Sequence, residues 1–209
     1  MSAEGLHIDH VIYGVVDIDA AAAHLREEYG LGAIPGALHH GGTTNMFVPL
    51  RPPLFLELLG VGDTTLADGA WLDQTLGGRD RPLWWALAVD DLDETAARRG
   101  LPVQGGEGEL ADGSRITFRS AGMPRYPLPF FMGHDADFAT RVAVWERRAE
   151  EAAHDCAPGG FTFVEVGEPP EVLDAWLGDH GLPVRHVGGP MGLSGVGIET
   201  DRGEGGLRA

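Results

Sequence analysis

The sequence contains no lysine, a single cysteine and no apolar run long enough to span a membrane. All 15 basic residues are arginines, so the chain lacks the amine that lysine Schiff-base chemistry requires. The lone Cys156 excludes an intrachain disulfide and any metal site built from several thiolates. A membrane helix needs roughly 20 consecutive apolar residues, which occur nowhere in this sequence. These absences remove several classes of enzyme and membrane protein before any motif is considered.

The chain is strongly acidic, with a net charge of −17 over 209 residues. This charge repels phosphate backbones, so nucleic acid is not an expected partner. The first residues, "MSAEGLHIDH", lack the basic start and apolar core of a signal peptide. We therefore predict a cytoplasmic protein that does not bind membranes. The exclusive use of arginine, with abundant alanine and glycine, favours a GC-rich bacterial genome.

Two stretches of similar pattern, "IDHVIYGVVDIDAAAAHL" (8–25) and "PLWWALAVDDLDETAARR" (82–99), are expected to be repeats. Each predicts a strand followed by a helix that starts at an aspartate. In the first strand, Val11, Tyr13 and Val15 alternate on the face that should pack on the helix, so His10 should point to the concave face. The same alignment replaces His10 by Trp84.

The order of predicted elements divides the chain into a first module (1–62), a linker (63–82), a second module (83–135) and a C-terminal part (136–209). Helical spacing predicts a long helix in "DFATRVAVWERRAEEAAHD". "FTFVEV", "PPEVLDAWLGDHG" and "GVGIET" predict a partial third module on the same domain, and "DRGEGGLRA" is expected to be a frayed tail.

Four features together resemble the vicinal oxygen chelate superfamily, and its glyoxalase-like branch in particular. They are the "IDHV" strand with its helix, "HHGGTTN", "LFLELLGV" and "LPFFMG". The resemblance covers about two-thirds of the chain. It implies an α+β fold in which paired βαβββ modules form a cupped half-barrel around a small-molecule site, and family habit implies a homodimer.

In metal-dependent members of that superfamily, each module supplies a first-strand residue, often histidine, and a last-strand carboxylate. The first module matches with His10 and Glu57. The second has Trp84 in place of the histidine and Phe130, or Phe131 if the register shifts by one, in place of the carboxylate. Aromatic rings do not coordinate divalent ions, so a four-ligand site of the glyoxalase I type is not expected.

Two alternatives remain for the cofactor: a metal site with fewer ligands, or no metal at all. Two histidines and a carboxylate can hold iron, manganese or zinc with open positions, and His10, His40 and Glu57 are the candidate triad. Otherwise His10 and Glu57 form a hydrogen-bonded pair, because a carboxylate among apolar neighbours needs a partner. In that case Glu57 is the candidate general base and His10 orients it.

The remaining candidate site residues would hold a small-molecule ligand or substrate at the cup. They come from the "HHGGTTN" loop, from the aromatic positions of the concave face and from one arginine: His40, Thr44, Asn45, Phe55, Trp84, Phe130 and Arg125.

The sequence favours a glyoxalase-like enzyme acting on a carbonyl or hydroxyl compound. The first alternative is a binding protein without turnover, of the antibiotic-sequestering type, since an acidic, aromatic-lined cup suits planar or cationic ligands. A structural domain with a filled cup is the other alternative. Turnover of a carbonyl substrate would distinguish the enzyme from the binding protein. A cavity too small for any ligand would favour the structural domain.

Overall fold

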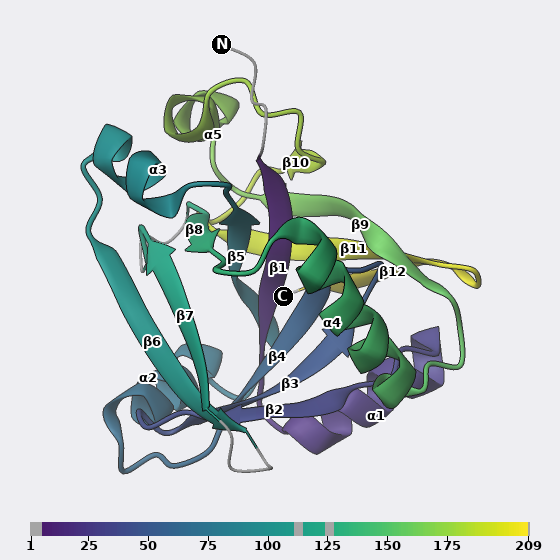
Figure 1. Ribbon diagram of the computed structural model, residues 1–209. Helices are drawn as coiled ribbons and strands as arrows, with labels where there is room; N and C mark the ends of the chain where they lie inside the picture. The colour runs from purple at the N-terminus through teal and green to yellow at the C-terminus, as the bar shows by residue number, and fades with distance from the viewer. Residues whose placement is uncertain (1–5, 111–114, 124–127, 209) are drawn as a thin grey trace.

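Eight strands close into a barrel that forms the body of the molecule (Figure 1). The computed structural model describes residues 6–110, 115–123 and 128–208. Neighbouring strands follow the order β1-β4-β3-β2-β6-β7-β8-β5. Their bounds are β1 (His7–Val15), β2 (Ile34–Leu38), β3 (Thr43–Pro49), β4 (Phe55–Val61), β5 (Arg81–Ala88), β6 (Val103–Leu110), β7 (Arg115–Ala121) and β8 (Phe130–Gly133).

The barrel consists of two half-barrels with the same element order, which confirms the predicted α+β fold of βαβββ modules. Helix α1 (Ile18–Tyr29) follows β1, and helix α3 (Leu92–Arg99) follows β5. Asp17 and Asp91 lie 74 residues apart and cap the two helices, each accepting a backbone N–H with its side chain. The two halves join along β1 and β5, and more narrowly where β2 pairs with β6.

Two further helices lie against the barrel. Helix α2 (Ala67–Leu76) packs on β1, β3 and β4, and its Leu72 and Leu76 join a core cluster that includes Ile12. Helix α4 (Phe138–Ala152) runs across β2 and β3, in front of the barrel in Figure 1. The predicted long helix is therefore confirmed, and its position over the barrel is a result of the tertiary structure.

The C-terminal part forms a second sheet of four strands in the order β10-β9-β11-β12. Its elements are β9 (Pro158–Val166), α5 (Pro170–Leu177), β10 (Val184–His186), β11 (Leu193–Thr200) and β12 (Gly203–Arg208). The expectation of a frayed tail was wrong: residues 203–208 pair with β11 as an antiparallel strand. Here backbone pairing along β11 outweighs the low strand propensity of a glycine-rich segment.

The main core lies between the outer face of the barrel, α1 and the second sheet. Val11, Tyr13 and Val15 share one cluster with Leu25 of α1, as predicted, and also with Val164 of β9. Among the described residues, no helix is both long and apolar enough to cross a membrane. The outward face of β1 is thus covered by two layers, and its other face, which carries Ile12, points into the barrel.

Candidate functional site

Strand alternation and register bring a histidine and a carboxylate together inside the barrel. In the parallel β1–β4 pair, His10 is level with Phe55, and Ile12 is level with Glu57. His10 Nε2 lies 3.8 Å from Glu57 Oε2. Both side chains are largely buried, with 5% and 12% of their surface exposed. His10 and Glu57 therefore lie close together between two neighbouring strands.

Asn45 of β3 holds the other oxygen of Glu57. Its Nδ2 donates to Glu57 Oε1 at 2.8 Å, while its own Oδ1 accepts the backbone N–H of Ala37 at 2.6 Å. The amide therefore has a fixed orientation, because one end is tied to the backbone and the other to the carboxylate. Glu57 Oε2 is left facing His10.

Asp9 is the residue that holds the opposite side of the histidine ring. Its Oδ2 accepts from His10 Nδ1 at 2.8 Å, and its Oδ1 accepts from His134 Nε2 at 2.7 Å and from the guanidinium of Arg141. Burial, with only 1% of the side chain exposed, opposes ionisation of Asp9. The hydrogen bonds and charges of His10 and His134 outweigh this and hold the pKa of Asp9 well below its ordinary value.

The ionised state of Asp9 decides which nitrogen of His10 is available for chemistry. An ionised carboxylate can only accept hydrogen bonds, so His10 Nδ1 carries the proton that it donates to Asp9. The other ring nitrogen, Nε2, faces Glu57 Oε2. These two atoms come from neighbouring strands and point toward one another inside the barrel.

Aromatic rings surround this polar pair. Phe55 stacks on His10 with ring centroids 4.6 Å apart, and Phe130 presents an edge to His10 at 5.8 Å. Trp145 of α4 stacks on Phe55 at 4.1 Å. Trp84 stacks instead on Trp71 of α2, at 5.1 Å. The rings exclude water from the histidine.

Strand β7 contributes a further apolar side chain to the concave face. Phe118 shares a face of β7 with Ser120, which pairs with Met132 beside Phe130. Opposite Phe118, β6 has Gly106, where an added Cβ would lie 2.2 Å from the Phe118 ring. The ring is 37% exposed, so this side of the barrel is not filled by core packing.

Several predicted site residues are not brought to this pair. Thr44 lies on the opposite face of β3 from Asn45, because neighbouring residues of a strand point to opposite sides. His40 lies in the turn between β2 and β3. The β4 residue nearest to that turn is Val61, which pairs with Thr43. Glu57 lies four residues from Val61, which is about 13 Å along the strand. Arg125 lies outside the described residues.

The donor set does not fit a resident metal ion. Within residues 6–110, 115–123 and 128–208, no three histidine, cysteine or carboxylate side chains are placed to share a metal. The candidate triad is not assembled, because the length of β4 separates His40 from Glu57. His10 and Glu57 supply two donors, whereas three protein ligands are usual at catalytic zinc.

Asp9, His134, Arg141 and Trp145 were not predicted from the sequence as site residues. A signal existed for Asp9, since an acidic residue inside the apolar strand "HIDHVIYGVV" requires a buried partner. His134 and Arg141 lie 125 and 132 residues further along the chain, so no local pattern links them to it. Trp145 belongs to a predicted helix whose packing partner the sequence left open.

The chain belongs to the family of glyoxalase-like domains, whose family model matches residues 8–181. This confirms the glyoxalase-like assignment that the sequence motifs indicated. Among curated proteins, no sequence matches the chain.

Similar solved structures have low sequence identity to this chain. A hypothetical protein from Staphylococcus aureus is 13% identical, with a TM-score of 0.63 over 89% of this chain and 87% of that one. Methylmalonyl-CoA epimerase from Mycobacterium tuberculosis is 19% identical, with a TM-score of 0.45 over 64% and 91% of the two chains. The Streptomyces coelicolor epimerase with 2-nitronate-propionyl-CoA is 24% identical, with a TM-score of 0.47 over 64% and 97%.

The repeat register predicts a gain of metal binding when the second module is given the ligand types of the first. Ile12 is level with Glu57, and Ala86, 74 residues later, is level with Phe130. We expect Trp84→His combined with Phe130→Glu to bind Zn²⁺ at least tenfold more tightly than the unmodified protein, because four donors replace two. Titration calorimetry measures this, with Trp84→His alone as control. A folded double variant without the gain would contradict the register.

Proposed function

We propose that the protein is a glyoxalase-like enzyme that transfers a proton on a small carbonyl or hydroxyl compound. Glu57 is the general base, His10 acts beside it, and Phe55, Phe130 and Trp84 hold the apolar part of the substrate. The observation that carries the proposal is the continuous chain of contacts from Asp9 through His10 to Glu57 and Asn45 among aromatic walls. The metal-free alternative is preferred because the donor set for a metal is not assembled.

The chemistry follows from the free atoms of this chain. Glu57 Oε2 takes a proton from the carbon next to the substrate carbonyl, and the electron pair of the C–H bond moves toward the carbonyl oxygen. Asn45 keeps the carboxylate in place during this step. The hydrogen bond from His10 Nδ1 to Asp9 stabilises positive charge on the ring, so a protonated Nε2 can donate to the developing oxyanion. Returning the proton from Glu57 completes an isomerisation or epimerisation.

A binding protein without turnover is the second candidate. The aromatic rings around His10 favour it, because apolar rings beside a polar pair suit a planar ligand. The two candidates share the same cup and differ only in whether Glu57 accepts a proton. The cytoplasmic location and the homodimer remain predictions under both.

Hydrogen exchange tests the enzymatic proposal directly. The protein is incubated in D₂O with a panel of small hydroxyketones, ketoacids and aldehydes, and loss of the C–H signal next to the carbonyl is followed by NMR. Where the unmodified protein catalyses exchange, we expect Glu57→Gln to slow it at least 100-fold, because general-base catalysis contributes about 10²–10⁴-fold.

The control is Glu28→Gln, an equally conservative change at an exposed position of α1 that should leave exchange unaltered. A Glu57→Gln variant that retains the full exchange rate would show that another group is the base. Saturable ligand binding with no exchange for any compound would instead support the binding protein.

A further inference from the structure

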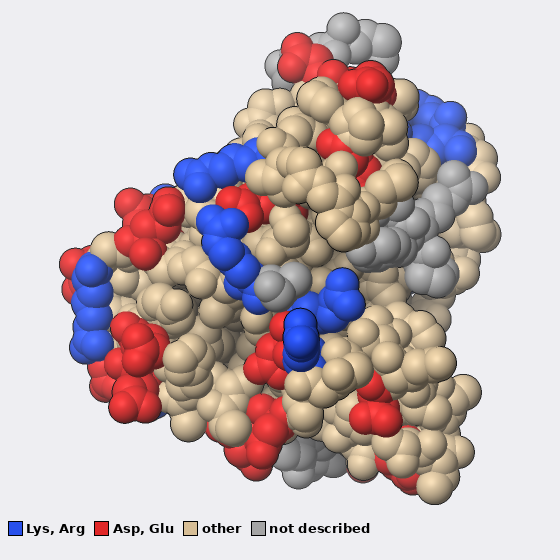
Figure 2. Space-filling view, turned by 180° about the vertical axis from the view of Figure 1, so that it is seen from behind, with Lys and Arg blue, Asp and Glu red and all other residues tan. Residues whose placement is uncertain are grey.

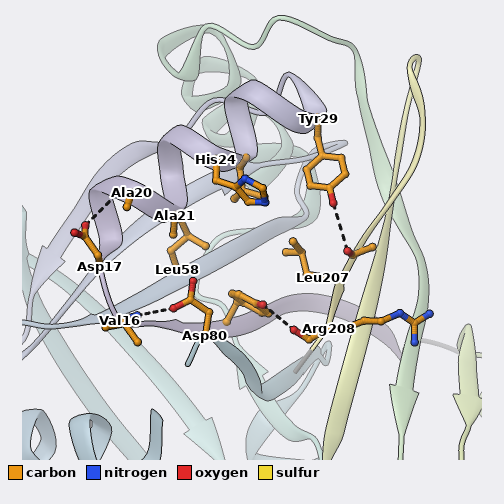
Figure 3. A pocket seen from close by; sticks show the side chains of 13 residues that line it. Val16, Asp17, Ala20, Ala21, His24, Tyr29, Leu58, Asp80, Leu207 and Arg208 are labelled. Atoms are coloured by element: carbon orange, nitrogen blue, oxygen red, sulfur yellow. Dashed lines mark hydrogen bonds between the residues drawn. The ribbon is translucent and has the colours of Figure 1, made fainter. Parts of the chain in front are cut away.

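A cavity lies outside the barrel, between α1 and the C-terminal strand β12, and no part of the proposed reaction uses it (Figure 3). Its volume is about 410 Å³, within the roughly 300–1,000 Å³ typical of small-molecule sites. We call it the α1–β12 groove. Figure 2 shows acidic side chains scattered over one face of the molecule.

Two tyrosines hold β12 in the position that forms the groove. The hydroxyl of Tyr13, on the outward face of β1, donates to the carbonyl of Arg208 at 2.9 Å, and the hydroxyl of Tyr29 donates to the carbonyl of Gly206 at 3.4 Å. Gly205 permits this approach, since an added Cβ would lie 2.7 Å from the Tyr29 ring. These contacts fix β12 as one wall of the groove.

One end of the groove carries a negative charge. Asp80 accepts the backbone N–H of Val16 at 2.7 Å with one carboxylate oxygen, and its other oxygen points toward α1 (Figure 3). Burial, and next the charge of Asp80, raise the pKa of Tyr13 to about 12. Asp80 and Tyr13 thus both line the groove. The second carboxylate oxygen of Asp80 and the hydroxyl oxygen of Tyr13 can each accept a further hydrogen bond.

The arginine that lines the groove turns its positive charge away from it. The side chain of Arg208 points away from Asp80 in Figure 3, and its guanidinium pairs with the carboxylate of Glu165. It also lies over the ring of Phe163, 5.9 Å from the centroid. Arg208 contributes its backbone carbonyl to the groove wall, and its charge is compensated outside.

Apart from Asp17 and His24, the rest of the lining is apolar. Ala20 and Ala21 of α1 face Leu58 of β4 and Leu207 of β12 across the groove. Small side chains on the helix leave a slot rather than a sphere, and such a shape suits a planar ring system. A net charge of −17 further raises the local concentration of cations.

We propose that the α1–β12 groove binds a small organic ammonium compound with a planar apolar body. The ammonium donates to the free oxygen of Asp80 and to the hydroxyl oxygen of Tyr13, and the ring system lies between the alanines of α1 and the leucines opposite. This site is separate from the cup, and the proposal does not depend on the proposed reaction.

Tryptamine and indole-3-propionate are matched probes, because they share the indole ring and a short chain and differ in the sign of the charge. Titration calorimetry should give saturable tryptamine binding and at least tenfold weaker binding of the acid. Asp80→Asn should weaken tryptamine binding about tenfold, since it keeps the oxygen that accepts from Val16 and removes the charge. Ala20→Phe, at an exposed helix position, should block binding by filling the slot.

Glu57→Gln is the matched control, because it removes a carboxylate from the cup and leaves the groove intact. Unchanged tryptamine affinity in this variant, with the losses in Asp80→Asn and Ala20→Phe, supports the proposal. Three results would overturn it: no saturable tryptamine binding by the unmodified protein, equal affinity for both probes, or a loss in Glu57→Gln that exceeds the loss in Asp80→Asn.

Discussion

Replacing Asp9 by asparagine is expected to lower the free energy of unfolding by about 3–5 kcal/mol, because removing one partner of a buried ion pair leaves the other charge uncompensated. The carboxylate is 1% exposed and accepts from His10, His134 and Arg141. An asparagine amide retains one acceptor oxygen for these donors and presents an NH₂ group to the others. Urea denaturation followed by circular dichroism measures the loss.

Asp93→Asn is the matched control, since Asp93 also pairs with an arginine, Arg119, but is 67% exposed. Exposed pairs contribute about 0–1 kcal/mol, so this variant should unfold close to the unmodified protein. Equal losses in the two variants would show that burial of Asp9 does not determine its contribution.

The contribution of Asp9 should also depend on pH with a definite sign. The pKa of Asp9 is held well below its ordinary value of 3.8, so the folded state favours the ionised form. The resulting stability is fully present above about pH 4 and is lost as the pH falls below that value toward the lowered pKa of the folded state. The stability difference between the unmodified protein and Asp9→Asn should therefore shrink in acid. A constant difference would contradict the low pKa.

Trp145→Ala is expected to cost about 3–5 kcal/mol of unfolding free energy, the range found when large aromatic side chains are removed from cores. Trp145 is 8% exposed, stacks on Phe55 at 4.1 Å and presents its edge to Phe47 at 5.7 Å. The Arg148 guanidinium lies over its ring, 4.7 Å from the centroid. Loss of the ring leaves a cavity between α4 and the barrel. Urea denaturation measures the cost.

Trp71→Ala provides the comparison, because Trp71 is 41% exposed and makes its ring contact with Trp84 alone among the described aromatic pairs. Its removal should cost less than about 2 kcal/mol. Trp145→Ala should in addition bind the dye ANS more strongly, since it uncovers the Phe55 and Phe47 rings. Similar losses in the two variants would mean that α4 is not anchored through Trp145.

The sequence by itself determined the features that depend on neighbours along the chain. Alternation along β1 places His10 opposite the Val11 face, and the repeat pattern places Asp17 and Asp91 at equivalent helix starts. The pairing of a first-strand histidine with a last-strand carboxylate followed from the family motifs. These inferences succeeded because period-two alternation and helix capping are local properties.

Only the tertiary structure decided the parts of the site that come from distant segments. Asp9 contacts His134 and Arg141, which follow it by 125 and 132 positions in the chain. Helix α4 is held over the barrel by the packing of Trp145 on Phe55. Strand β12 forms because β11 offers it a pairing edge, although glycine-rich residues 203–208 carry a weak strand signal. The physical reason is the same in each case: a buried charge, an aromatic face or an open strand edge requires a partner, and the fold selects which one.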